Sequence, residues 1–386
     1  MHSPAIDMLF LSTWPPRECP TATYTHGMVQ ALKAGDAVAP RVMAVNHEAQ
    51  TYRDDVLAQF LQGHWISHLA AAELVNEADP DLVMVEHSFD VFGGRHGGHL
   101  LSLLQRLAVP YLVTCHTVPT TPDSHQRDTL GEICHSSIGV VVTSPYARQA
   151  LNQYYYVPSE KITVLPRGVG QLQPADREAL KGISGLQGKT VLCTCGALGP
   201  DSGLEYGLEA LARVLKTHPD VHYFIAGETH PDMPAGQGDA WRAALAGLVQ
   251  ALGIGAHVHF INRPLALAEQ QNFLQMADIY LAPCPSWLQT TSSLLAHAVG
   301  CGRAAVATPS LHAQEMLAEG RGMLAHFQDA QSLARCINTL IENPVLKESM
   351  EACALRYGKE MAWPKVARHY EDYFTATAAE YRLPVS

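Results

Sequence analysis

The stretch KTVLCTCGALGPDSGLEYGLEA, residues 189–210, decides the fold that we predict for this chain. Residues 190–195 are a short β-rich apolar run, and Gly196, Gly199 and Gly203 mark a turn after it. The apolar residues that follow recur at helical spacing, so the stretch predicts a strand, a glycine turn and a helix. Such a turn directs the free N–H groups of the helix start beyond the carboxyl end of the strand, where the helix dipole also favours an anion such as a phosphate.

The glycine pattern by itself leaves two interpretations open. It differs from the dinucleotide-binding fingerprint, and no Gly-Lys-Ser/Thr follows it as in a P-loop. A plain structural turn explains the spacing as well as an anion site does.

Strand and helix patterns alternate in two series along the chain. The first series has predicted strands at 7–12, 81–86, 109–115, 138–143 and 161–165, with residues 46–76 predicted to be mostly helical. Residues 168–188 are polar and contain Pro and Gly, which predicts a linker. The second series has predicted strands at 190–195, 221–226, 257–261, 278–282 and 304–307, and the chain from residue 330 onwards is predicted to be helical. We therefore predict an α/β protein of two doubly wound, Rossmann-like domains that face each other across a cleft.

Composition restricts the partners and the compartment. The 386 residues include 37 acidic and 26 basic side chains, and no basic stripe is present, which argues against nucleic acid and anionic membranes as partners. Nine cysteines without a CxxC pair are typical of reduced thiols. No apolar run reaches the roughly 18 residues needed to span a bilayer, and the start of the chain lacks the basic region of an export signal. We expect a cytoplasmic protein.

The twenty histidines raise the question of a metal site. His64 with His68, and His96 with His99, are the closest pairs. Neither pair has acidic or thiol ligands at site spacing, so no metal site is predicted.

Eight stretches along the chain form a recognisable set. They are STWPPRECPTAT at 12–23, EHSFDVFGG at 86–94, TCHTV at 114–118, SEKITVLPRGV at 159–169, CGALGPDSGLE at 195–205, AGETHP at 226–231, QTTSSLLAHAVGCG at 289–302 and ATPSLHAQEMLAEGRG at 307–322. In residue type, order and spacing the set resembles the retaining, two-domain sugar-nucleotide transferases of glycosyltransferase family four, which have the GT-B fold. The closing MAWPKVARHYEDYF, 361–374, is similar to the last helix of that family, which returns to the first domain.

The resemblance implies a division of labour between the domains. Residues 1–170, with the helix at 364–386 packed on them, would form the acceptor-side domain, and residues 187–363 the donor-nucleotide domain. His116 is the implied catalytic residue, beside the transferred sugar. The implied acceptor-side residues are Arg17, Thr23, His87 and Ser88. The implied donor-binding residues are Arg167, Gly196, Gly199, Ser202, Arg263, Gln289, Thr291, Ser292, Ser293, His297 and Glu315.

The chain departs from the family pattern where the donor diphosphate is expected. Ala197 and Ser202 stand in the turn where the family usually has an Arg or Lys pair, so two charge-assisted hydrogen bonds of about 1.5–3 kcal/mol each are missing. Gln289 and His297 replace two glutamates. Arg167 replaces a histidine, and we hypothesise that its permanent charge takes over the neutralisation of phosphate. Further departures are Ser88 for an acid, Asp90 for a glycine and Ser293 for a glycine.

The leading functional hypothesis is therefore transfer of a sugar from a nucleotide sugar, UDP- or GDP-linked, to a soluble acceptor with retention at the anomeric carbon. The resemblance implies no metal or other cofactor, and it is compatible with a homodimer or a paralogous partner. The charge balance and the lack of a long apolar run predict no nucleic-acid and no integral-membrane partner. Two alternatives stay open: a catalytically inactive homologue that acts as a scaffold for a partner, and a transferase or phosphorylase that uses a sugar phosphate.

Overall fold

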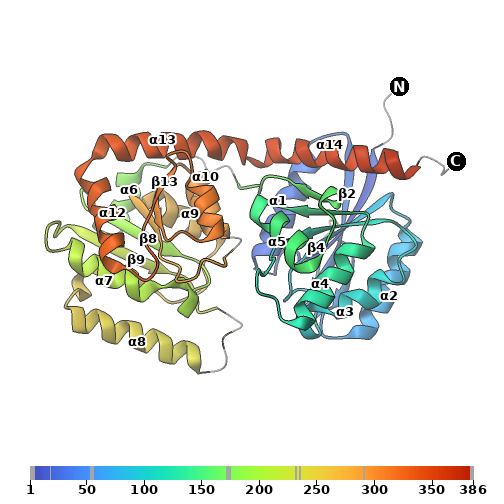
Figure 1. The fold of residues 1–386 in the computed structure, drawn as a ribbon, viewed down its shortest axis with the longest axis horizontal. Coiled ribbons are helices and arrows are strands. Elements are labelled where there is room, and N and C mark those ends of the chain that lie inside the picture. Colours follow the sequence, from blue (N-terminus) through green and yellow to red (C-terminus); the bar gives the residue numbers. More distant parts are fainter. Residues whose placement is uncertain are drawn as a thin grey trace. The chain divides into compact units, whose positions relative to one another are not determined.

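The computed structural model describes residues 5–17, 19–52, 56–170, 175–230, 233, 236–289 and 292–382. The chain divides into two units. Unit 1 comprises Met1–Val169 and Met361–Ser386, and unit 2 comprises Gly170–Glu360. Figure 1 shows the layers of helices and strands within each unit.

Unit 1 is built on a parallel sheet that has seven strands in the described part of the chain, in the order β3-β2-β1-β4-β5-β6-β7. Its strands are β1 (Ile6–Ser12), β2 (Val38–Asn46), β3 (Val56–Leu61), β4 (Leu82–His87), β5 (Tyr111–Cys115), β6 (Gly139–Val142) and β7 (Ile162–Val164). The order runs one way from β1 and the other way from β4. The winding therefore switches between these two strands, and α/β sheets bind ligands outside the carboxyl ends of the strands at such a point.

Helices cover both faces of this sheet. They are α1 (Pro20–Leu32), α2 (Trp65–Ala78), η1 (Arg95–Gly97), α3 (His99–Leu104), α4 (Ser124–Ser136), α5 (Pro145–Tyr155), η2 (Ser159–Lys161) and α14 (Trp363–Arg382). Met8 and Phe10 of β1 pack in the same cluster as α1 and α14, whereas Leu9 and Leu11 pack with α2 to α5. The strand is apolar on both faces because both faces are buried. The last helix, α14, drawn in red in Figure 1, lies against α1 and belongs to unit 1.

Unit 2 repeats this construction with a parallel sheet of six strands among its described residues, in the order β10-β9-β8-β11-β12-β13. Its strands are β8 (Thr190–Cys195), β9 (Val221–Ala226), β10 (Val258–Ile261), β11 (Ile279–Ala282), β12 (Ala304–Ala307) and β13 (Gly322–Leu324). The winding switches between β8 and β11, which are hydrogen-bonded neighbours.

The helices of unit 2 are α6 (Arg177–Ile183), η3 (Pro200–Ser202), α7 (Leu204–Val214), α8 (Gln237–Leu252), η4 (Gly255–His257), α9 (Leu267–Met276), α10 (Ser293–Gly300), α11 (Leu311–Met316), α12 (Ala330–Glu342) and α13 (Pro344–Glu360). Helices α7, α8 and α12 share one apolar cluster with the sheet. Helices α9, α10 and α13 contact the sheet through β8 and β12. Of the helices in the described part of the chain, none combines the length and the apolar character needed to cross a membrane.

The predicted fold class is confirmed, since both units are α/β with parallel sheets. The helical prediction for residues 46–76 is wrong over β3, which precedes α2. The run VLAQFL of β3 is too short for periodicity to separate a strand from a helix. The linker prediction for 168–188 misses α6, which begins after Asp176, whose side chain accepts from the N–H groups of Glu178 and Ala179.

Candidate functional site

The turn after β8 forms the centre of the candidate site in unit 2. Gly203, at φ 63°, ends η3 and precedes α7. A Cβ at Gly203 would lie 2.0 Å from the carbonyl oxygen of Pro283, which follows β11. Only glycine fits this left-handed position so close to a neighbouring backbone. The start of α7 is therefore held against the carboxyl end of β11, at the switch point of the sheet.

Helix α10 begins after the same strand, β11, and its first turn is capped. The Ser292 hydroxyl accepts from the Leu295 N–H (3.4 Å), and the Ser292 N–H donates to Nδ1 of His312 (3.1 Å). In the turn after β8, the Ser202 hydroxyl accepts from the Gly199 N–H (3.0 Å). Both serine hydroxyls thus serve as caps. The capacity to bind an anion here lies with the backbone N–H groups and the dipoles of α7 and α10.

The other predicted donor residues occupy several separate positions in unit 2. Gln289 is exposed, and its carbonyl accepts from the His312 N–H (3.1 Å). His297 bonds through Nδ1 to the carbonyl of Ser293 one turn earlier in α10 (2.7 Å). Glu315 lies in α11, where its carbonyl accepts from Arg321. Thr291 lies outside the described residues.

Arg263 has a partner of its own at the start of α9. Its guanidinium pairs with both carboxylate oxygens of Glu269, at 2.6 and 2.9 Å. The hydrogen bond and the charge of Glu269 raise the pKa of Arg263, and Glu269 also accepts from the Ala266 N–H. In this arrangement Arg263 supports the N-terminal cap of α9.

In unit 1, the predicted catalytic residue His116 follows β5 and is held by a buried acid. Its Nε2 lies 2.7 Å from Oε2 of Glu86, which is 0% exposed. The His116 N–H also donates to the carbonyl of His87, the last residue of β4 (3.0 Å). The pair is therefore fixed at the carboxyl edge of two neighbouring strands. A carboxylate bonded to one imidazole nitrogen sets the orientation of the ring.

His87 is buried and both of its ring nitrogens lack a hydrogen-bond partner within the described residues. Its ring stacks on Phe92 (centroids 6.4 Å apart) and meets Phe89 edge-on (5.2 Å). Burial, and to a lesser extent His116, lower the pKa of His87 to about 4. His87 is thus neutral at physiological pH. Next to it, the Ser88 hydroxyl bonds to the side chain of Asp90 (2.5 Å).

Arg167 and Tyr24 extend this cluster. Arg167 is 7% exposed, and its guanidinium carbon lies 5.1 Å from the centroid of the Tyr24 ring. The same ring lies 4.8 Å from that of His116, and its hydroxyl bonds to the Tyr370 hydroxyl of α14 (2.7 Å). Burial lowers the pKa of Arg167, and the neighbouring Tyr24, Tyr370 and Glu86 oppose that shift. Tyr24 therefore contacts both a buried cation and the His116 imidazole.

The two remaining acceptor-side residues lie around α1. The Arg17 guanidinium donates to the Gln62 side chain (2.8 Å) and to the carbonyl of Val45 (3.3 Å), and so joins β2 to the loop after β3. Thr23 is exposed on the first turn of α1, where its N–H donates to the Cys19 carbonyl. Both positions lie near carboxyl ends of strands in the sheet of unit 1.

Sequence reasoning did not identify three residues that shape these sites. Glu86 could have been found, because a carboxylate at the end of an apolar strand needs a partner when it is buried. Arg242 of α8 donates to the Gly227 carbonyl (2.8 Å) and to the Asn262 side chain (2.9 Å), so it braces the ends of β9 and β10. The sequence carries no signal for this role, nor for that of His312.

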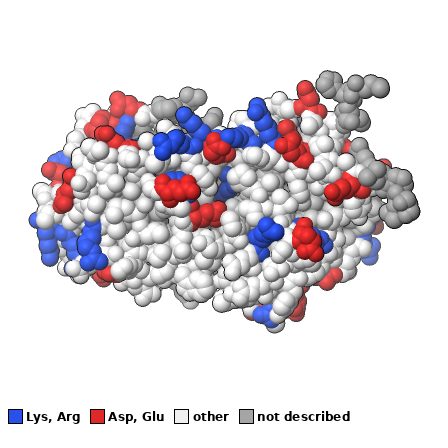
Figure 2. Space-filling model, turned by 45° about the horizontal axis from the view of Figure 1, so that its top comes forward, with Lys and Arg blue, Asp and Glu red and all other residues white. Residues whose placement is uncertain are grey.

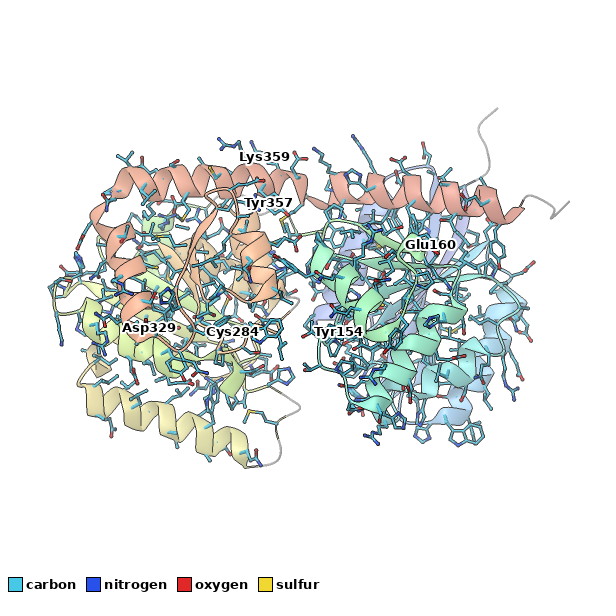
Figure 3. All side chains as sticks on the ribbon, in the orientation of Figure 1. Tyr154, Glu160, Cys284, Asp329, Tyr357 and Lys359 are labelled. Carbon is cyan, nitrogen blue, oxygen red and sulfur yellow. The ribbon has the colours of Figure 1, made fainter. Side chains whose placement is uncertain are left out.

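The surface views agree with a mixed distribution of charge. On the face shown in Figure 2, Lys and Arg side chains are interspersed with Asp and Glu, and much of the face carries neither. Figure 3 places Cys284 in unit 2, in the segment that follows β11. Among the described residues, no group of three or more His, Cys, Asp or Glu side chains is placed to hold a metal ion.

Comparison with known families gives two matches that together span most of the chain. The model for glycosyl transferases group 1 matches residues 176–357, and that for glycosyltransferase family 4 matches residues 21–170. The boundary between the matches falls within a few residues of the boundary between units 1 and 2.

The curated relatives have low sequence identity to this chain. A D-inositol 3-phosphate glycosyltransferase of Nocardioides is 26% identical over 255 residues, which is 64% of this chain and 55% of the relative. A phosphatidyl-myo-inositol mannosyltransferase of Mycobacterium tuberculosis is 28% identical over 243 residues, 61% of this chain and 59% of the relative. The chain thus spans about half the length of the curated relatives it matches.

Solved structures share the fold. HepE of Anabaena, in complex with UDP and glucose, matches with a TM-score of 0.76 at 16% identity over 96% of this chain and 100% of that one. A sucrose-phosphate synthase from Thermosynechococcus elongatus matches with a TM-score of 0.78 at 16% identity over 97% and 99%.

Proposed function

The chain belongs to the group 1 glycosyltransferases, and from this premise we propose that it transfers a hexosyl group from a nucleotide sugar to a soluble acceptor, with retention at the anomeric carbon. The observation that carries the proposal is the switch point of unit 2, where the starts of α7 and α10 follow two adjacent strands. The GT-B structures similar to this chain include one whose protein is in complex with UDP-glucose. We therefore propose a UDP- or GDP-linked donor.

The chemistry requires stabilisation of a departing diphosphate and of an oxocarbenium-like sugar. We assign the diphosphate to the N–H groups of α7 and α10, which act without a metal ion because preorganised dipoles need no reorganisation as charge develops. The leaving phosphate then accepts the proton of the acceptor hydroxyl on the same face of the sugar. Holding the two reactants in this geometry supplies a further part of the rate enhancement.

Unit 1 would supply the acceptor side and His116. Glu86 orients the His116 imidazole at 2.7 Å, and we propose that this imidazole contacts the transferred sugar. Arg167 is proposed as the cation for the leaving phosphate, in place of the missing lysine at Ser202. Its packing over Tyr24 would fix the guanidinium plane.

The test is a calorimetric titration with UDP-, GDP-, ADP- and TDP-sugars and with sugar 1-phosphates, with and without EDTA. A ligand that binds only the folded protein stabilises it by about 2.7 kcal/mol at one hundred times its Kd. We expect one nucleotide sugar to bind, with an affinity that EDTA does not change. When an acceptor sugar is added, we expect release of the nucleoside diphosphate and a glycoside product whose anomeric proton signal shows the configuration of the donor. A response to sugar phosphates alone would favour the phosphorylase alternative, and no response would favour the scaffold. The relatives named as glycosyltransferases favour the transferase.

Two variants test the assigned residues. His116→Ala is expected to lower turnover with little effect on nucleotide affinity, because His116 is assigned to the sugar. Arg167→Gln is expected to lower nucleotide affinity. Arg148→Gln is the control, since Arg148 is on α5 and its guanidinium donates to the exposed Ser159 carbonyl. Equal affinity of the Arg167 and Arg148 variants would restrict Arg167 to its packing against Tyr24.

A further inference from the structure

His312 bonds to two residues, Gln289 and Ser292, that the proposed function assigns to the donor. Its N–H donates to the carbonyl of Gln289 (3.1 Å), and its Nδ1 lies 3.1 Å from the backbone nitrogen of Ser292. One residue of α11 therefore bonds to residue 289 through its main chain and to residue 292 through its side chain. The two bonds therefore join α11 to the loop after β11 and to the N-cap of α10.

The side-chain bond determines the state of the imidazole. A backbone N–H can only donate, so Nδ1 of His312 must be the acceptor and the proton must reside on Nε2. His312 is 3% exposed, so water does not compete for the bond. A buried acceptor of this kind is specific, because any side chain without an acceptor at that point leaves the Ser292 N–H without its partner.

Residues next to His312 also bond to the loop that follows β11. The Leu311 N–H donates to the Trp287 carbonyl (3.1 Å), and the Thr308 hydroxyl donates to the carbonyl of Cys284, the residue labelled in Figure 3. The chain from the end of β12 to the start of α11 is thus hydrogen-bonded to the loop after β11, from Cys284 onwards. His312 is the member of this set that reaches the N-cap of α10.

We propose that His312 is a positioning residue for the sugar donor. It fixes the spacing between Gln289, assigned to the sugar hydroxyls, and the start of α10, assigned to the diphosphate. Because Gln289 and Ser292 are held before the ligand arrives, the donor does not have to order these two residues on binding. The inference rests on the proposed function, because that function assigns Gln289 and the start of α10 to the donor.

The test compares three substitutions of His312. His312→Asn keeps an acceptor oxygen attached to Cγ, as Nδ1 is. His312→Leu removes the acceptor, and His312→Gln moves it by one bond and serves if the leucine variant does not fold. All three keep the backbone bond to Gln289. His326→Leu is the control, because the His326 side chain is 79% exposed.

Two measurements are made on each variant. Hydrogen exchange of the peptide that contains Ser292 should be faster in His312→Leu and His312→Gln than in the wild type, and restored in His312→Asn. The KM for the nucleotide sugar should rise roughly 10- to 100-fold in the same two variants, with Asn within about threefold of wild type, since a small misplacement of binding groups has effects of this size.

The outcomes separate this inference from the proposed function. Unchanged exchange in His312→Leu would overturn the clamp itself. Faster exchange with an unchanged KM would show that the bond exists but does not position the donor, which also overturns the inference. A wild-type protein that binds no member of the donor panel would refute the proposed function, and the inference with it, whatever the exchange data show.

Discussion

Replacement of Gly203 by alanine is the most direct test of the site in unit 2. Gly203 has φ 63°, and a Cβ there would lie 2.0 Å from the Pro283 carbonyl oxygen. The left-handed conformation costs a residue with a Cβ about 1–2 kcal/mol. Relief of the clash requires α7 or the segment after β11 to move, at a further cost of about 1–3 kcal/mol. We expect unit 2 to lose about 2–5 kcal/mol of stability and the protein to lose affinity for the donor nucleotide.

Gly253 provides the matched control. It has φ 68° at the end of α8, and no atom lies within 4 Å of the position of its Cβ. Gly253→Ala carries the same backbone strain without the clash, so it should cost only the first 1–2 kcal/mol and leave nucleotide affinity unchanged. Thermal unfolding reads the difference, at about 2–4 °C per kcal/mol for a domain of this size. Equal stability and equal affinity of the two variants would refute the role given to the turn.

Three further substitutions probe buried polar groups. The pKa of His87, about 4, lies below its value in the unfolded chain, so the free energy of unfolding should fall as the pH drops from 6.5 towards 4. His87→Leu lacks the titrating group, so its free energy of unfolding should fall by about 3 kcal/mol less over the same range. Denaturant titrations at the two pH values measure the difference. Tyr370→Phe should cost about 1–3 kcal/mol of stability because it leaves the buried Tyr24 hydroxyl without its partner, and a smaller cost for the Tyr24→Phe/Tyr370→Phe double variant should show the coupling in a double-mutant cycle. Lys181→Met should cost about 1–3 kcal/mol, because it removes the buried ammonium that pairs with Asp278 at 2.9 Å, while Arg177 stays 3.3 Å from the same carboxylate. Denaturation no easier than in wild type would show that the pair contributes nothing.

The fold could be predicted because the central strands are buried on both faces and therefore appear in the sequence as short apolar runs. Runs such as residues 190–195 are apolar throughout because helices cover both faces of the strand, and the glycine at 203 marks the turn that follows. The prediction fails at β3, an edge strand whose six residues have no diagnostic period. It also misses α6, which is seven residues long; the capping Asp176 and the acidic Glu178 in its first turn are signals too short to outweigh the polar stretch around them.

Only those residues of the candidate site that belong to a local sequence motif could be predicted. His116 and the turn at Gly203 belong to such motifs, and the structure places each at the carboxyl edge of a parallel sheet. The partners of these residues come from elsewhere: Glu86 is 30 residues from His116, and Tyr370 is 346 residues from Tyr24. Contacts of this kind depend on tertiary packing, which no local pattern reports.

Two arginines of unit 2, Arg242 and Arg263, bear on how a diphosphate could be bound there. Arg242 and Arg263, which follow β9 and β10, bond to loop groups and to Glu269 respectively. Ser202 caps its own turn and carries no charge. An anion at the switch point would therefore be held by backbone N–H groups whose partial charges are fixed in place, and such groups bind well only if the chain around them is rigid. Under the proposed function, that requirement would account for the glycine turn without room for a Cβ and for the two bonds of His312, which lie at the two helix starts that follow β8 and β11.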